Sequence, residues 1–129
     1  MRARVLVIAA LLGVLAAKAD VAAQRLTPHV SGWERYFTVS WETFERRGRP
    51  HLSGYVVNKY GSPASRIQLL VESLDSSGQV LEQRVEWLGG DVGPFSRRYF
   101  EVAVPQPALK YQVSIFAFDV LQAAFLQAP

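Results

Sequence analysis

The residues best suited to metal chemistry are few and widely separated. The 129-residue chain contains two histidines, His29 and His51, and no cysteine. A site built on these histidines would need a further ligand at a spacing such as H-x-x-x-H, and neither has one. Each lies next to a proline, which is typical of a turn or a strand start. The sequence therefore predicts no metal and no cofactor, and the lack of cysteine excludes thiol nucleophiles and disulfides.

The hydroxyl and carboxyl groups show no catalytic spacing either. There is no G-x-S-x-G motif, and Ser96 adjoins arginines rather than a base. Glu82 and Glu86 lie about 13 Å apart if they share a strand, as expected of a solvated pair. A hydrolase would have to combine carboxylates from distant loops, such as Glu45 and Asp91. We therefore predict that the chain is not an enzyme and keep such a hydrolase as the least favoured alternative.

Arginines form the densest charged cluster, at Arg46, Arg47 and Arg49. A guanidinium group has a planar fork of donors that fits carboxylate and phosphate groups. The cluster is therefore a candidate anion contact. The alternative is the solvated tip of a hairpin, because charge runs usually face water.

Aromatic side chains offer a candidate partner surface. Four of them fall on the faces opposite the main apolar stripe of their predicted strands, namely Tyr55, Tyr99, Phe116 and Phe118. An exposed aromatic patch is the usual mark of a protein contact. The alternative is that the C-terminal tail, residues 119–129, folds back over them with its own apolar side chains, Leu121, Phe125 and Leu126.

The elements that would hold these residues are strands. Apolar and polar residues alternate in six segments, at residues 36–44, 51–58, 66–74, 79–88, 97–104 and 111–118. Turn residues separate them, including the polar connection 45–50 and the type I turn pattern Asp75–Gly78. Gly54, in mid-strand, predicts a bulge or a close backbone approach. This pattern predicts an all-β fold, a single antiparallel β-sandwich of about six to eight strands.

A family resemblance covers about half of the chain, from Gly54 to Asp119. Its motifs are, in order, Gly54-Tyr-Val-Val-Asn58, Asp75-Ser-Ser-Gly78, Gly93-Pro94, Phe100-Glu-Val102 and Tyr111-Gln-Val113. This order resembles the FxLYD-type and related immunoglobulin-like domains of exported bacterial proteins. At the namesake motif the chain reads Val71-Glu-Ser-Leu-Asp75, which keeps only the aspartate. The resemblance implies a sandwich module of the cell envelope that binds or spaces other components and has no catalytic residues.

The N-terminus has the three parts of a secretory signal peptide. Arg2 and Arg4 precede an unbroken apolar run, Val5–Ala17, and small residues follow. The run has 13 residues, whereas a membrane span needs about 20. We predict cleavage after Ala23, or else after Ala19, leaving no stable membrane span. The expected location is the periplasm or the medium.

Removal of residues 1–23 changes the charge. That segment holds three basic residues and one acidic one, so residues 24–129 hold 11 basic and 10 acidic side chains. A net charge of +1 gives no field for nucleic acid, which we exclude as a partner. We expect an irregular lead-in at 24–35, the sandwich at 36–118 and the tail at 119–129. The predicted function is an exported, non-catalytic envelope module that binds an envelope protein or is structural. The alternative is a carrier of a small apolar or anionic ligand.

Overall fold

The computed structural model describes residues 25–121, so the predicted signal peptide, both cleavage sites and the tail beyond Leu121 lie outside it. Within this range there is one short 3-10 helix, η1 (Trp33–Arg35), and no α-helix. Six strands follow in the order β1 (Phe37–Arg46), β2 (Arg49–Asn58), β3 (Ala64–Leu74), β4 (Val80–Trp87), β5 (Arg97–Ala103) and β6 (Lys110–Val120). The six strands predicted from alternation are confirmed.

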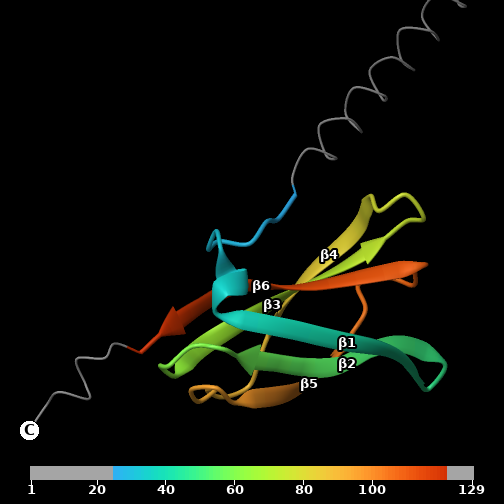
Figure 1. Cartoon of the computed structure of the whole chain (residues 1–129). Helices are drawn as coiled ribbons and strands as arrows, with labels where there is room; N and C mark the ends of the chain where they lie inside the picture. The colour runs from blue at the N-terminus through green and yellow to red at the C-terminus, as the bar shows by residue number, and fades with distance from the viewer. Residues whose placement is uncertain (1–24, 122–129) are drawn as a thin grey trace, which may run out of the picture.

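The strands form two antiparallel sheets of three strands each. Their orders are β1-β2-β5 and β4-β3-β6, so the chain leaves the first sheet after β2 and returns to it for β5. Figure 1 shows the two layers, with β1, β2 and β5 side by side. The prediction of an all-β, sandwich-like fold is thereby confirmed.

The first hairpin is tighter than its sequence predicted. Arg47 and Gly48 form a two-residue turn with φ of 54° and 74°, the pattern of a type I′ turn. Pro50, expected in the loop, lies in β2 opposite Glu45. Proline is tolerated there because pairs joined by backbone hydrogen bonds alternate along the β1–β2 ladder with pairs that have none. The closing pair, Arg46 and Arg49, is bonded, so the nitrogen of Pro50 points away from β1.

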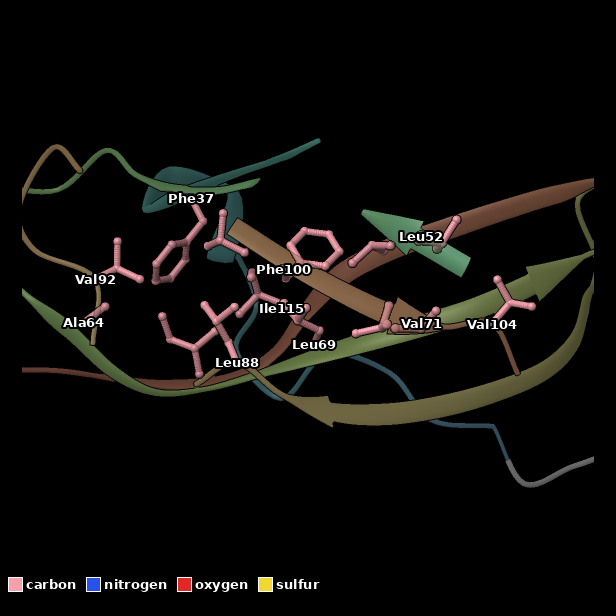
Figure 2. Close-up of a cluster of buried hydrophobic side chains, with 14 residues drawn as sticks. Phe37, Leu52, Ala64, Leu69, Val71, Leu88, Val92, Phe100, Val104 and Ile115 are labelled. Carbon is pink, nitrogen blue, oxygen red and sulfur yellow. The ribbon is translucent and has the colours of Figure 1, made fainter. Parts of the chain in front are cut away.

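The core lies between the two sheets. In β2 and β5 the buried residues fall at every second position or multiples of it, as period-2 patterning requires. Phe37, Leu52, Val56, Phe100 and Val102 come from one sheet, and Ile67, Leu69, Val71, Val113 and Ile115 from the other. Figure 2 shows the labelled side chains of this cluster meeting between the ribbons, with Val92 and Leu88 from the connecting segments.

A β-bulge in β6 corrects the predicted orientation of Phe118. Leu69 pairs with Ile115 but Gln68 pairs with Ala117, so Phe116 is an extra residue on β6. The alternation is reversed beyond it. Phe118 therefore turns inward, against the ring of Phe37 at 4.8 Å between centroids.

Strand β4 also departs from its alternation pattern. Arg84 and Glu86 lie opposite Val71 and Leu69, so the polar residues of β4 share the inward-facing side of the sheet. Trp87 takes the outward-facing side and is 63% exposed. The reason is that β4 is an edge strand, where inward-facing charges still reach water at the side of the sandwich.

A buried asparagine ties together the loops at one end of the sandwich. Asn58 is 1% exposed, and its amide Nδ2 donates to the carbonyls of Ser62, Val92 and Gly93 at 2.9, 3.2 and 3.1 Å. Its Oδ1 accepts the backbone N–H of Tyr60 at 2.9 Å. One side chain therefore satisfies four backbone groups and fixes the loops on both sides of β3 and β4.

Candidate functional site

The outward-facing side of the β1-β2-β5 sheet carries the most distinctive group of exposed side chains. Since Leu52 and Phe100 face the core, the residues that alternate with them face solvent. Register places Ser40, Tyr55 and Tyr99 in one row across the sheet, and Glu42, Ser53 and Glu101 in the next. We call these six residues the tyrosine face.

The two tyrosines that name this face are direct cross-strand neighbours. Tyr55 pairs with Tyr99, and their rings meet edge to face at 5.5 Å between centroids. The guanidinium carbon of Arg97 lies 4.3 Å from the centre of the Tyr55 ring, in a cation–π contact. Tyr99 remains 51% exposed. The pair thus presents two rings held in a fixed geometry at the surface.

Glu101 anchors the other end of the face. The hydroxyl of Tyr99 donates to its Oε1 at 2.8 Å, and Nη2 of Arg46 lies 2.8 Å from its Oε2. The hydrogen bond to the carboxylate raises the pKa of Tyr99. The same bond, together with the Arg46 charge, lowers the pKa of Glu101. Both pKa values move away from neutrality, opposite to the change that general acid–base catalysis requires.

A shallow hollow lies within this face. Its volume is about 230 Å³, and its lining joins residues of all three strands: Ser40, Trp41, Glu42, Ser53, Gly54, Tyr55 and Tyr99. Gly54 permits a close approach of β1, because a Cβ atom there would lie 1.8 Å from the backbone oxygen of Ser40. The predicted close approach at Gly54 is confirmed. The hollow offers hydroxyl, carboxylate and aromatic groups to a ligand.

A larger hollow of about 490 Å³ opens at the end of the sandwich beside the β1–β2 turn. Its lining combines two arginines from different sheets with prolines and small apolar residues: Arg49, Pro50, His51, Arg84, Ala103, Val104, Pro105, Gln106 and Pro107. The connection after β5 forms one wall, where Oγ of Ser73 donates to the carbonyl of Gln106 at 2.7 Å.

The structure separates the three arginines predicted as one anion contact. Arg46 is paired with Glu101 and lies 5.4 Å from the centre of the Phe44 ring. Arg47 forms the turn and is exposed. Arg49 lines the larger hollow together with Arg84. No sequence pattern indicated Arg84 as its companion, because the pairing of β3 with β4 and the contact between the sheets bring them together.

The four predicted aromatic residues also divide. Tyr55 and Tyr99 lie together, but Phe116 and Phe118 lie on the other sheet, Phe118 turned inward by the bulge. Phe116 is 9% exposed, and the ring of His29 covers it at 4.2 Å between centroids. Among the described residues, the segment that covers Phe116 is therefore the N-terminal one around His29. The single surface of four aromatics was a wrong prediction. Arg97 and Glu101 were missed, although strand alternation places both on the side of Tyr99.

The carboxylates considered for hydrolysis do not converge. Glu45 lies opposite Pro50 at one end of β2, whereas the loop of Asp91 and Val92 is tied to Asn58 at the other. Eight residues of strand separate these ends, about 27 Å at ~3.4 Å each. Across residues 25–121 no group of three His, Asp or Glu side chains is arranged to hold a metal ion. The same range contains no helix long and apolar enough to span a membrane.

Comparison with known proteins yields no relative: no family model matches the chain, and neither a curated protein nor a solved structure matches it.

Proposed function

We propose that this chain is an exported, non-catalytic envelope module that binds another protein through the tyrosine face. The observation that carries the proposal is the Tyr55–Tyr99 pair, fixed by Arg97 on one side and by Glu101 on the other. Tyrosine and arginine are enriched among the residues that dominate protein contacts. Rings already held in place lose little conformational entropy on binding.

The direct test places a photo-cross-linking amino acid at position 55 in cells that export the chain. We expect discrete adducts with another exported protein, and we expect the Tyr99→Ser change to remove them. Position 112 is the matched control, because Gln112 is exposed on the other sheet. Equal adducts at both positions, or none at position 55, would count against the proposal.

Export itself rests on residues 1–23, whose charged start, apolar run and small residues are those of a signal peptide. N-terminal sequencing of the protein recovered outside the cytoplasm tests it. We expect the first residue to be Gln24, or Asp20 if cleavage follows Ala19. A recovered chain that still begins at Met1 contradicts cleavage.

We also propose that the sandwich is immunoglobulin-like, in agreement with the resemblance described above. Two features support this. The orders β1-β2-β5 and β4-β3-β6 correspond to strands A-B-E and C′-C-F of that fold. In addition, the Tyr111 hydroxyl at the start of β6 accepts the backbone N–H of Ala108 at 2.9 Å, which is the arrangement of a tyrosine corner. Tyr111→Phe should cost about 1–2 kcal/mol of stability because that N–H loses its partner.

A second candidate function is carriage of a small anionic ligand, favoured by the hollow that Arg49 and Arg84 line. Its volume of about 490 Å³ lies within the usual range for ligand pockets. Calorimetric titration with benzoate and phenyl phosphate tests it. Binding should weaken in Arg84→Gln and stay unchanged in Arg47→Gln, which removes the same charge at the hairpin turn. Equal binding by both variants would dismiss this hollow as the site.

A further inference from the structure

Strand β5 is an open edge of its sheet. It pairs with β2 on one side, and within residues 25–121 no strand pairs with its other side. In an antiparallel ladder, pairs with hydrogen bonds alternate with pairs without them. The backbone N–H of Asn58 donates to the carbonyl of Ser96 at 2.8 Å, so that pair is a bonded one. The bonded positions of β5 are therefore the even-numbered residues that follow Ser96.

The odd-numbered residues of β5 consequently direct their backbone N–H and C=O groups to the open side. These are Arg97, Tyr99 and Glu101, followed by Ala103 at the strand end. Such a row of unpaired groups is a template for pairing with another strand. Proteins often protect an edge strand from such pairing with charged side chains. On the outward-facing side of β5 the charged side chains are Arg97 and Glu101, which have opposite signs and lie two residues before and after Tyr99.

This spacing makes the edge complementary to itself. When a second β5 runs antiparallel with Tyr99 opposite Tyr99, Arg97 lies opposite Glu101 of the partner subunit. By the two-fold symmetry, Glu101 lies opposite the partner's Arg97. Opposite charges and paired aromatic rings are both favourable directly across a ladder.

We propose that two copies of this chain pair antiparallel along β5, with the two-fold axis at Tyr99. The two sheets of order β1-β2-β5 then join into one continuous sheet of six strands. Three bonded pairs with two hydrogen bonds each give about six new backbone bonds. These bonds satisfy the groups that the open edge leaves to solvent.

The charges select this register over its neighbours. A shift of two residues would place Tyr99 opposite the partner's Glu101 and Arg97 opposite the partner's Ala103, so both ion pairs would be lost. A shift of one residue would place residues whose backbone groups point to the open side opposite residues whose backbone groups point to β2. It would also turn the outward-facing side chains of one subunit to the opposite face of the joined sheet. Glu101 already accepts from Tyr99 and Arg46. Its two oxygens have about four acceptor positions, which leaves room for the partner's Arg97.

This pairing does not depend on the proposed function. It shares Tyr99 and Glu101 with the tyrosine face but forms through the backbone edge of β5, whereas Ser40, Ser53 and Tyr55 lie further in on β1 and β2. If the tyrosine face binds no protein, the dimer is unaffected. If both proposals hold, the dimer presents two copies of that face on one sheet.

Two charge-reversal variants test the pairing. The protein is expressed as the full chain and studied as purified after export, by sedimentation velocity. Arg97→Glu places two carboxylates opposite each other at each ion pair, and Glu101→Arg places two guanidinium groups there. Each variant alone should dimerise at least about tenfold more weakly than wild type. An equimolar mixture should form heterodimers. The Arg97→Glu chain then has acidic side chains at positions 97 and 101, and the Glu101→Arg chain has basic side chains at both. Each cross-strand pair of the heterodimer therefore joins opposite charges.

The control is Arg47→Glu, which makes the same charge change at the hairpin turn and should leave dimerisation unaltered. A wild-type chain that sediments as a monomer up to about 1 mM overturns the proposal, since even a contact of about 4 kcal/mol would be visible there. So does a mixture of the two variants that stays monomeric while both remain folded by circular dichroism.

The absence of cysteine allows the register to be tested separately. Tyr99→Cys places one thiol from each subunit at the two-fold axis, and a short bis-maleimide should link them. Ser53→Cys lies on the same side of the sheet but on the central strand, and should link much more slowly. Equal linking at both positions, or preferential linking of Tyr99→Cys to Glu101→Cys chains, rejects the register.

Discussion

The ring of His29 packs on the ring of Phe116 at 4.2 Å between centroids, and the His29 backbone N–H donates to the Phe116 carbonyl at 2.8 Å. The segment that begins near Arg25 is therefore part of the folded domain and not only a linker to it. Leu26 reinforces it, since its N–H and C=O both bond to the side-chain amide of Gln83, at 2.9 and 2.8 Å.

This contact predicts an asymmetry between two aromatic residues that face the same side of the sheet. Phe116→Ala should lower the free energy of unfolding by about 3 kcal/mol, because it leaves a cavity under His29. Trp87→Ala should cost less than about 1 kcal/mol, because the indole is 63% exposed. Urea unfolding followed by circular dichroism measures both values. Equal costs would mean that the N-terminal segment does not cover this side of the sheet in solution.

Gly54→Ala should be among the most damaging single changes in the chain. The new Cβ would lie 1.8 Å from the oxygen of Ser40 and 2.8 Å from Cα of Trp41, both backbone atoms of the facing strand. Backbone cannot rotate away as a side chain can, so β1 and β2 would have to separate, at a cost of at least about 2 kcal/mol. Gly89→Ala is the control, since nothing lies within 4 Å of its added Cβ. Chemical denaturation of the two variants should differ clearly, and similar midpoints would contradict the close approach.

These cases show what alternation in the sequence can and cannot predict. The strands were predictable because apolar and polar residues alternate along them, and Gly54 was noticeable because glycine is unfavourable in a strand without a reason. The bulge at Phe116 was not predictable, since an extra residue on one strand is defined only relative to its partner. It reversed the expected direction of Phe118.

The candidate site was predictable only in part, for the same reason. Tyr55 and Tyr99 were identified by their places on their own strands, but their contact depends on β5 returning beside β2. Glu101 lies two residues from Tyr99, so alternation alone could have indicated it. The link to Arg46 could not be foreseen, because the two residues are far apart in sequence and on strands that β2 separates.

Asn58 provides a prediction for the loops. Asn58→Asp keeps the acceptor for the Tyr60 N–H but replaces a donor to three carbonyl oxygens with a carboxylate. We expect a loss of about 2–4 kcal/mol at pH 7, because the three carbonyls lose their donor and a buried charge faces them. Burial among carbonyl oxygens should raise the pKa of the new acid in the folded state. Its protonated form is therefore favoured by folding, and the variant should regain stability relative to wild type as the pH falls. Thermal unfolding at pH 7 and pH 5 measures this, and a deficit that does not shrink at pH 5 would contradict it.

The bond between Tyr99 and Glu101 predicts the alkaline behaviour of the tyrosine face. The carboxylate accepts the phenolic proton and raises the pKa of Tyr99 above its ordinary value near 10. For a group whose pKa is raised by folding, the stabilisation is present below the unfolded pKa and is lost as the pH rises through the folded one. In Glu101→Gln, the acceptor loses its charge, so the pKa of Tyr99 should fall back toward 10. The ultraviolet absorbance of phenolate, compared with Tyr99→Phe to isolate this ring, gives the titration curve. Arg84→Gln serves as the control, since Arg84 lies on the other sheet, and an unchanged Tyr99 titration in Glu101→Gln would show that the hydrogen bond does not persist in solution.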